Sequence, residues 1–308
     1  GWPELAFCMA SIDRHLIDFA VSSMMRCSII GSLRGMVAGD RPSSQDTRLL
    51  RPAERGNRPA RLSMDLVNRY ILDAMVHLAV LIGGAALPAA ILVILFRRAD
   101  RARPEPVGLI GRSVLYGFLA TIPAIALELL VGIPAAYLPG LAGAAWSAFV
   151  TAALVEEGVK YFFLSRYLLR NEAFDEVMDG IVYAACVSLG FAFAENLMYG
   201  VGGGWVLLFR AFTAVPMHAA ATGIMGYWLG LSKRESDSAL AASCRRKGFI
   251  AAVVVHGFYD FFLFAGPPLA VGAILTLFVA VRALRRLVRR AKELDDAAAS
   301  TRRALGLS

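Results

Sequence analysis

Eight side chains that can carry charge stand inside apolar stretches of this chain, where such groups are rare. They are Glu156, Glu157, Lys160, Glu195, Arg210, His218, His256 and Asp260. At the centre of a lipid bilayer each isolated charge would cost roughly 2.5–3.5 kcal/mol. Leaving all eight groups isolated is therefore too unfavourable, and we expect them to face one another or water in one functional site.

The spacing of these residues brings several of them to one helix face. Glu156 and Glu157 precede Lys160 by four and three residues, so the lysine can pair with either carboxylate. His256 and Asp260 are also four residues apart, which lets the aspartate orient the imidazole. The spacing thus predicts one ion-paired helix face and one carboxylate–imidazole pair.

Carboxylates and imidazoles in this combination suit hydrolysis, which needs a held water, a base, and positive charge where the oxyanion forms. In one hypothesis, His218, His256 and Glu195 bind Zn²⁺, which keeps an open position for water, and Glu156 or Glu157 is the base. In the alternative, the glutamates activate water without a metal and the histidines donate to the oxyanion. The HExxH spacing of soluble zinc proteases is absent, so metal ligands would have to come from three helices.

The composition indicates what surrounds these groups. Hydrophobic residues make up 57% of the 308 residues and charged residues 18%, with a mean hydropathy of +0.58. Soluble chains have about 45–50% apolar and about 25% charged residues, so a water-soluble enzyme is excluded. Spanning a bilayer takes about 20 apolar residues in a helix, because lipid offers no partners to an open backbone. We predict an all-α, polytopic transmembrane helix bundle of about seven spanning helices, at 71–96, 114–133, 141–164, 181–201, 205–231, 248–266 and 267–284.

The positive charges indicate how this bundle is oriented. Lys and Arg gather in loops 97–113, 165–180 and 232–247, whereas connections 134–140 and 202–204 carry none. Short cytoplasmic loops of membrane proteins are enriched in Lys and Arg. We therefore predict a cytoplasmic C-terminus, and the net charge of +8 reflects topology rather than nucleic-acid binding. The four cysteines form no CxxC pair, which argues against a thiolate zinc site.

The chain divides into three regions by composition. Residues 1–63 are rich in Arg, Pro and Ser and have no apolar period, so we predict a disordered arm. A native start at Met64 would make this arm a non-native extension. Residues 64–284 form the predicted transmembrane domain. Residues 285–308 form a predicted basic amphipathic cytoplasmic tail, which either lies on anionic lipid or serves as a solvated topology anchor.

Motifs on successive segments follow the order of a known family. Residues 156–160 read EExxK, residues 191–196 read FxxxEN, and Arg210, His218 and the 256–260 segment follow. This set resembles the PrsW family of intramembrane proteases, which is distantly similar to the CAAX prenyl endopeptidase and bacteriocin-processing group. The prenyl-endopeptidase branch has EExxxR and FxxxH, whereas this chain has its lysine at a shorter spacing and a glutamate in place of that histidine.

The resemblance covers about residues 110–265 and implies an intramembrane endopeptidase of the bacterial plasma membrane. Its expected substrates are membrane-anchored, single-span proteins cleaved in regulated proteolysis. The expected catalytic residues are Glu156, Glu157, Glu195, His218 and His256, with Lys160, Asn196 and Asp260 in support. Two other classes stay open at this point: a proton- or cation-coupled transporter and a catalytically silent membrane scaffold. Against a transporter, the segments show no inverted repeat.

Overall fold

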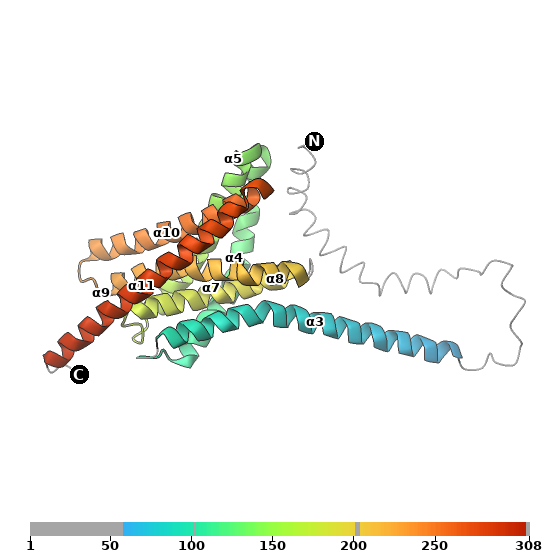
Figure 1. Cartoon of the computed structure of the whole chain (residues 1–308), viewed down its shortest axis with the longest axis horizontal. Coiled ribbons are helices and arrows are strands. Elements are labelled where there is room, and N and C mark those ends of the chain that lie inside the picture. The colour runs from blue at the N-terminus through green and yellow to red at the C-terminus, as the bar shows by residue number, and fades with distance from the viewer. Residues whose placement is uncertain (1–57, 101–102, 201–203, 306–308) are drawn as a thin grey trace, which may run out of the picture. The chain divides into compact units, whose positions relative to one another are not determined.

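The structure is a computed structural model that describes residues 58–100, 103–200 and 204–305. These ranges contain helices and no β-strand, which confirms the predicted all-α class (Figure 1). The prediction of a disordered arm concerns residues that for the most part lie outside the described ranges. The α-helices are α3 (Arg58–Ala99), α4 (Val107–Val131), α5 (Gly140–Ala145), α6 (Val155–Phe163), α7 (Val177–Gly200), α8 (Gly204–Phe212), α9 (Ala214–Arg234), α10 (Ser238–Phe264) and α11 (Val271–Ala304).

The chain divides into two compact units, residues 1–80 and 81–308. In the described part of the first unit, the side chains of helix α3 from Leu66 to Val80 are exposed. The second unit holds all eight ionisable residues singled out in the sequence. The functional site is therefore built entirely within residues 81–308.

Within the described residues, six helical stretches are long and apolar enough to cross a membrane, so the chain is a multi-pass membrane protein. They are Leu66–Ala99, Val107–Tyr137, Val177–Gly200, Trp205–Arg234, Ser238–Phe264 and Pro267–Ala304. They correspond to six of the seven predicted segments. The remaining predicted segment, 141–164, is helical but is not one uninterrupted α-helix, because π-helical turns at Trp146–Leu154 and Leu164–Leu168 flank α6.

The predicted segment 205–231 also contains a break, between α8 and α9. Thr213 leaves the helical conformation at φ −121° and ψ −74°, and its hydroxyl donates to the Phe209 carbonyl. Pro216 lies in the first turn of α9, where its missing N–H would have no partner within the helix in any case. The break therefore separates Arg210 on α8 from His218 on α9.

Glycines allow the closest helix contacts in the core. A Cβ added at Gly226 of α9 would collide with the Gly180 carbonyl oxygen of α7, and one added at Gly230 would lie 2.7 Å from the Val177 Cα. Gly226 and Gly230 therefore form a small-residue packing face, as glycines four residues apart often do in membrane helices. Further along α7, Gly117 of α4 meets the Val187 carbonyl in the same way. Helix α7 is thus packed closely against two neighbouring helices.

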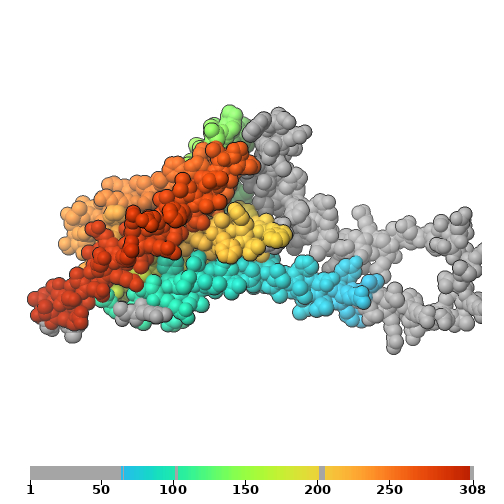
Figure 2. Space-filling view, viewed as in Figure 1, coloured from blue at the N-terminus to red at the C-terminus, as the bar shows by residue number. Residues whose placement is uncertain are grey.

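The predicted tail continues α11 without a break, and its apolar side packs on the protein. Ala291 of the tail is 0% exposed and Leu284, directly before the tail, is 7% exposed, so both lie in the core rather than against lipid. Asp295 accepts the backbone N–H groups of Val177 and Met178 at 3.0 and 2.9 Å, which caps the start of α7. Figure 2 shows α11 (red) crossing the face of the bundle over α9 and α10.

Candidate active site

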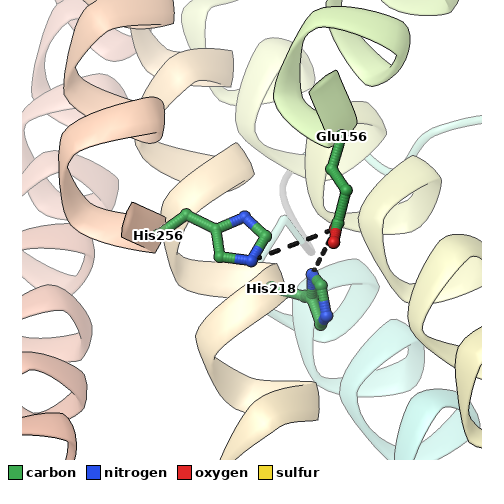
Figure 3. A group of neighbouring side chains, drawn as sticks. All are labelled: Glu156, His218 and His256. Atoms are coloured by element: carbon green, nitrogen blue, oxygen red, sulfur yellow. Dashed lines mark ion pairs between the residues drawn. The ribbon is translucent and has the colours of Figure 1, made fainter. Parts of the chain in front are cut away.

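Four helices bring the predicted site residues together in the interior. Helix α6 carries Glu156, α9 carries His218 and α10 carries His256, and these side chains point toward one another (Figure 3). The Glu156 Oε2 atom lies 3.8 Å from His218 Nδ1 and 3.9 Å from His256 Nε2. Helix α7 adds Glu195 beside His218. The convergence predicted from the cost of isolated polar groups is therefore present.

The carboxylates of α6 follow directly after a π-helical turn. Single π turns inside helices occur frequently at functional sites. Successive residues of an α-helix differ in direction by about 100°, so Glu156 and Glu157 cannot point the same way. Glu156 faces both imidazoles, while Glu157 is 0% exposed and faces Thr222 and His256. The two adjacent glutamates share Lys160 and His256, but only Glu156 lies near His218 and only Glu157 accepts from Thr222.

Lys160 is the central cation of the cluster and is 0% exposed. Its Nζ lies 3.0 Å from Glu156 Oε2 and 2.8 Å from Glu157 Oε1, which confirms the pairing expected from spacing. The same ammonium lies 3.2 Å from His218 Nδ1 and 4.2 Å from the centre of the Phe191 ring. A buried charge is tolerated only when it is paired and hydrogen-bonded, and Lys160 meets that condition.

Each imidazole has a carboxylate on one nitrogen and Glu156 near the other. His218 Nε2 lies 2.6 Å from Glu195 Oε2, and His256 Nδ1 lies 3.0 Å from Glu157 Oε1. The expected Asp260 contact is also present, at 3.2 Å from His256 Nε2. A carboxylate that accepts from one ring nitrogen fixes the tautomer of the imidazole. The second nitrogens also have partners, since Lys160 lies 3.2 Å from His218 Nδ1 and Asp260 contacts His256 Nε2, so a ligand at these nitrogens would have to displace them.

Arg210 holds Glu195 in place. Its Nη2 lies 3.1 Å from Glu195 Oε2, its Nε donates to Asn196 Oδ1 at 2.7 Å, and its guanidinium stacks over Tyr199. Asn196 is fully buried. These contacts place the FxxxEN motif on the Nε2 side of His218, whereas Glu156 lies near Nδ1. The group close enough to share a metal therefore contains Glu156, His218 and His256, with ligand atoms within 4.8 Å of one another.

Sequence reasoning missed two hydroxyl residues of the site. Thr222 Oγ1 donates to Glu157 Oε2 at 2.8 Å, and Ser188 Oγ donates to the His218 carbonyl at 2.7 Å. Hydroxyl residues are common in helix contacts within membranes, so their type alone gave no signal. Their spacing did give a signal. Thr222 is four residues after His218, and Ser188 is seven residues before Glu195, so each hydroxyl lies on the same helix face as a site residue.

The fold and the site define a polytopic membrane protein with hydrolase-type groups in its interior. A family model described as PrsW family intramembrane metalloprotease matches residues 105–284, which include every site residue. The chain belongs to the PrsW family of intramembrane metalloproteases. It is therefore a peptidase that acts within the membrane.

Relatives of known family give the same result. Protease PrsW of Geobacillus kaustophilus is 35% identical over 196 residues, which is 60% of this chain and 80% of that protein. Protease PrsW of Bacillus subtilis is 34% identical over 192 residues, or 61% and 84% of the two chains. Protease PrsW of Clostridioides difficile is 30% identical over 184 residues, or 58% and 77%. No solved structure matches this chain.

Proposed function

We propose that this intramembrane protease holds a divalent metal, Zn²⁺ by preference, between Glu156, His218 and His256. The observation that carries the proposal is the pairing of the two imidazoles. Each has one nitrogen fixed by a carboxylate and the other nitrogen within 4 Å of Glu156 Oε2. Two imidazoles and one carboxylate are a ligand set found in catalytic zinc sites. This set contains Glu156 where the sequence led us to expect Glu195.

The other charges of the site are consistent with a bound cation. Lys160 and a metal would compete for Glu156 and for His218 Nδ1, which lies 3.2 Å from the ammonium, but Glu157 offers the ammonium another acceptor at 2.8 Å. Glu195 is already neutralised by Arg210 and lies on the far side of the His218 ring. We therefore assign Glu195 the role of orienting His218, as outer-shell carboxylates of metal sites do.

In this proposal the residues of the site have separate roles in hydrolysis. A bound metal would act as a Lewis acid and make water a better nucleophile at neutral pH. Glu156 has two carboxylate oxygens: Oε2 faces the imidazoles, which leaves Oε1 to accept a proton from the attacking water. The same carboxylic acid then returns the proton to the leaving amine. Lys160 supplies fixed positive charge close to the developing oxyanion.

We further propose that the substrates are single-span membrane proteins and that the C-terminus lies in the cytoplasm of a bacterium, at the plasma membrane. Bacterial relatives and the Lys- and Arg-rich loops 97–113 and 232–247 support this orientation. Labelling of single cysteines introduced at Arg103 and Arg234 tests it. Reaction from the cytoplasmic side only is expected, and reaction from the outside would reverse the orientation.

The proteolytic assignment to this site is tested by a Glu156→Gln variant in cells that express single-span reporter proteins. We expect full-length insertion and a loss of cleavage of at least about 10²–10⁴-fold, the range for removal of a general base, because the variant also weakens a proposed metal ligand. The exposed acid Asp296 provides the matched control, because Asp296→Asn removes one carboxylate elsewhere in the chain. Unchanged cleavage in Glu156→Gln would refute the assignment, and altered ion flux without any cleaved product would favour a transporter.

A further inference from the structure

A second cluster of acids lies at the opposite end of α7 from Glu195. It consists of Asp100 directly after α3, Glu105 just before α4, and Asp179 in the first turn of α7. One carboxylate oxygen of each residue lies within 4.8 Å of the others, and the residues are 5%, 7% and 0% exposed. Asp179 and Glu195 are sixteen residues apart, about 24 Å along a helix, so this cluster is separate from the active site.

Among the described residues no cation forms an ion pair with this cluster, and the charges of Arg103 and Lys292 lower the pKa of Asp100 by less than burial raises it. The nearby Arg103 and Arg234 are already paired with Glu176 and Asp295, and no ion pair reaches the three acids within the described ranges. Burial, followed by the nearby Asp179 carboxylate, raises the pKa of Asp100 to about 6. Burying charge without a partner is strongly unfavourable, so these acids need either protons or a cation.

Two oxygens of the cluster also lack any hydrogen-bond donor. Within the part of the chain that the structure describes, the buried atoms Asp100 Oδ2 and Asp179 Oδ1 have no partner. Nearly all buried polar atoms in proteins have a partner, so such atoms point to a missing ligand. The partnered oxygens are held firmly: Asp179 Oδ2 accepts two backbone N–H groups at 2.7 and 2.9 Å, and the Tyr183 hydroxyl donates to Glu105.

We propose that Asp100, Glu105 and Asp179 bind one hard divalent cation of the Mg²⁺, Mn²⁺ or Ca²⁺ class. The donors are carboxylate oxygens without nitrogen or sulfur, which these ions prefer and which distinguish the cluster from the Glu/His site. Asp100 and Glu105 lie in the connection between α3 and α4, and Asp179 lies in the first turn of α7. A bound ion therefore ties the end of α3 and the segment before α4 to the start of α7.

Mn²⁺ binding to the full chain in detergent, counted by electron paramagnetic resonance, tests this proposal. The measurement uses the His256→Ala background, so that the Glu/His site does not contribute a bound ion. We expect one Mn²⁺ per chain, displaced by excess Mg²⁺ or Ca²⁺, and its loss in Asp100→Asn and in Glu105→Gln. Asp296→Asn, which removes a 74% exposed carboxylate on neighbouring α11, should keep the ion.

Two results would overturn the proposal. One is the absence of bound Mn²⁺ in the His256→Ala background, which needs no further variant and would show that the acids hold protons instead. The other is an equal number of bound ions in this background with and without Asp100→Asn, when both proteins have the same circular-dichroism spectrum. Because the catalytic ligand His256 is absent throughout, neither result bears on the proteolytic mechanism.

Discussion

Helices α4 and α7 are both apolar enough to cross a membrane, yet they occupy different environments. The most apolar part of the α4 span has a mean hydropathy of 2.1 but is only 22% buried in protein, whereas that of α7 has 1.8 and is 94% buried. The more apolar of the two helices is therefore the less buried one, so hydropathy alone does not predict which helix lies inside the bundle. What distinguishes α7 is that small residues admit neighbours on two sides: Gly180 meets α9 and Gly190 meets α4.

This difference explains where the chemistry lies. The polar groups of the site lie on the inward faces of α6, α7, α9 and α10, where each has a protein partner, although the most apolar part of α10 is only 28% buried. On lipid-facing surfaces the same groups would have none. This difference between inward-facing and outward-facing positions leads to three predictions, which follow from the largest expected effect to the smallest.

The largest expected effect comes from the two inner histidines. Alanine at His218 or His256 should abolish cleavage while leaving insertion unchanged, since each variant removes a proposed ligand. His77 of α3 offers a matched control, because it is exposed and bonds only to the carbonyl of Asp73 among described residues. Cleavage of a reporter in membranes is the measurement. If His77→Ala inactivates the enzyme as fully as His218→Ala, the contrast between inner and outer groups is wrong.

Glu195→Gln should have an intermediate effect. If Glu195 orients His218 without binding the metal itself, the amide loses charge but keeps an acceptor, and activity should fall by about 10–100-fold. The bound metal should remain at saturating concentration. Measuring the cleavage rate and the metal content of this variant in parallel shows whether Glu195 orients His218 or binds the metal. Complete loss of metal in this variant would make Glu195 a ligand, as the sequence alone led us to expect.

A smaller effect, on stability, is expected at the glycine contacts. Gly226→Ala would place a methyl group against the Gly180 carbonyl and 2.5 Å from the Ala184 Cβ. Overpacking of this kind destabilises proteins by about 1–3 kcal/mol. Gly111→Ala on α4 is the control, because nothing lies within 4 Å of an added Cβ. Thermal unfolding in detergent should show a lower midpoint for Gly226→Ala than for Gly111→Ala, and equal midpoints would contradict the close α7–α9 packing.

The sequence predicted the all-α class and the meeting of the buried polar groups, whereas the catalytic roles of these residues stay a prediction. The cost of polar groups in lipid required Glu156, Lys160 and His256 to meet, and spacing required the lysine pair. The π turns before and after α6 could not be predicted, because they depend on how neighbouring helices pack and leave no mark in the apolar pattern. The exchange of Glu195 for Glu156 in the proposed metal set depends on which edge of His218 each carboxylate meets, which spacing cannot specify.

The sequence also could not predict that the tail packs on the protein. An amphipathic period gives the apolar face of a helix but not what covers it, so Leu284 and Ala291 suited lipid and protein equally well. The structure buries this face and uses Asp295 to cap α7. Only the three-dimensional placement of α7 distinguishes these outcomes.

The metal content of the purified, active full chain tests the central claim most directly. If Glu156, His218 and His256 hold the ion that proteolysis requires, mass spectrometry of the native protein should find close to one zinc per chain. The His256→Ala protein, prepared in the same way, should carry almost none. Wild-type protein that cleaves its substrate at the full rate with far less than one metal ion per chain would contradict the claim and leave water activated by glutamate alone.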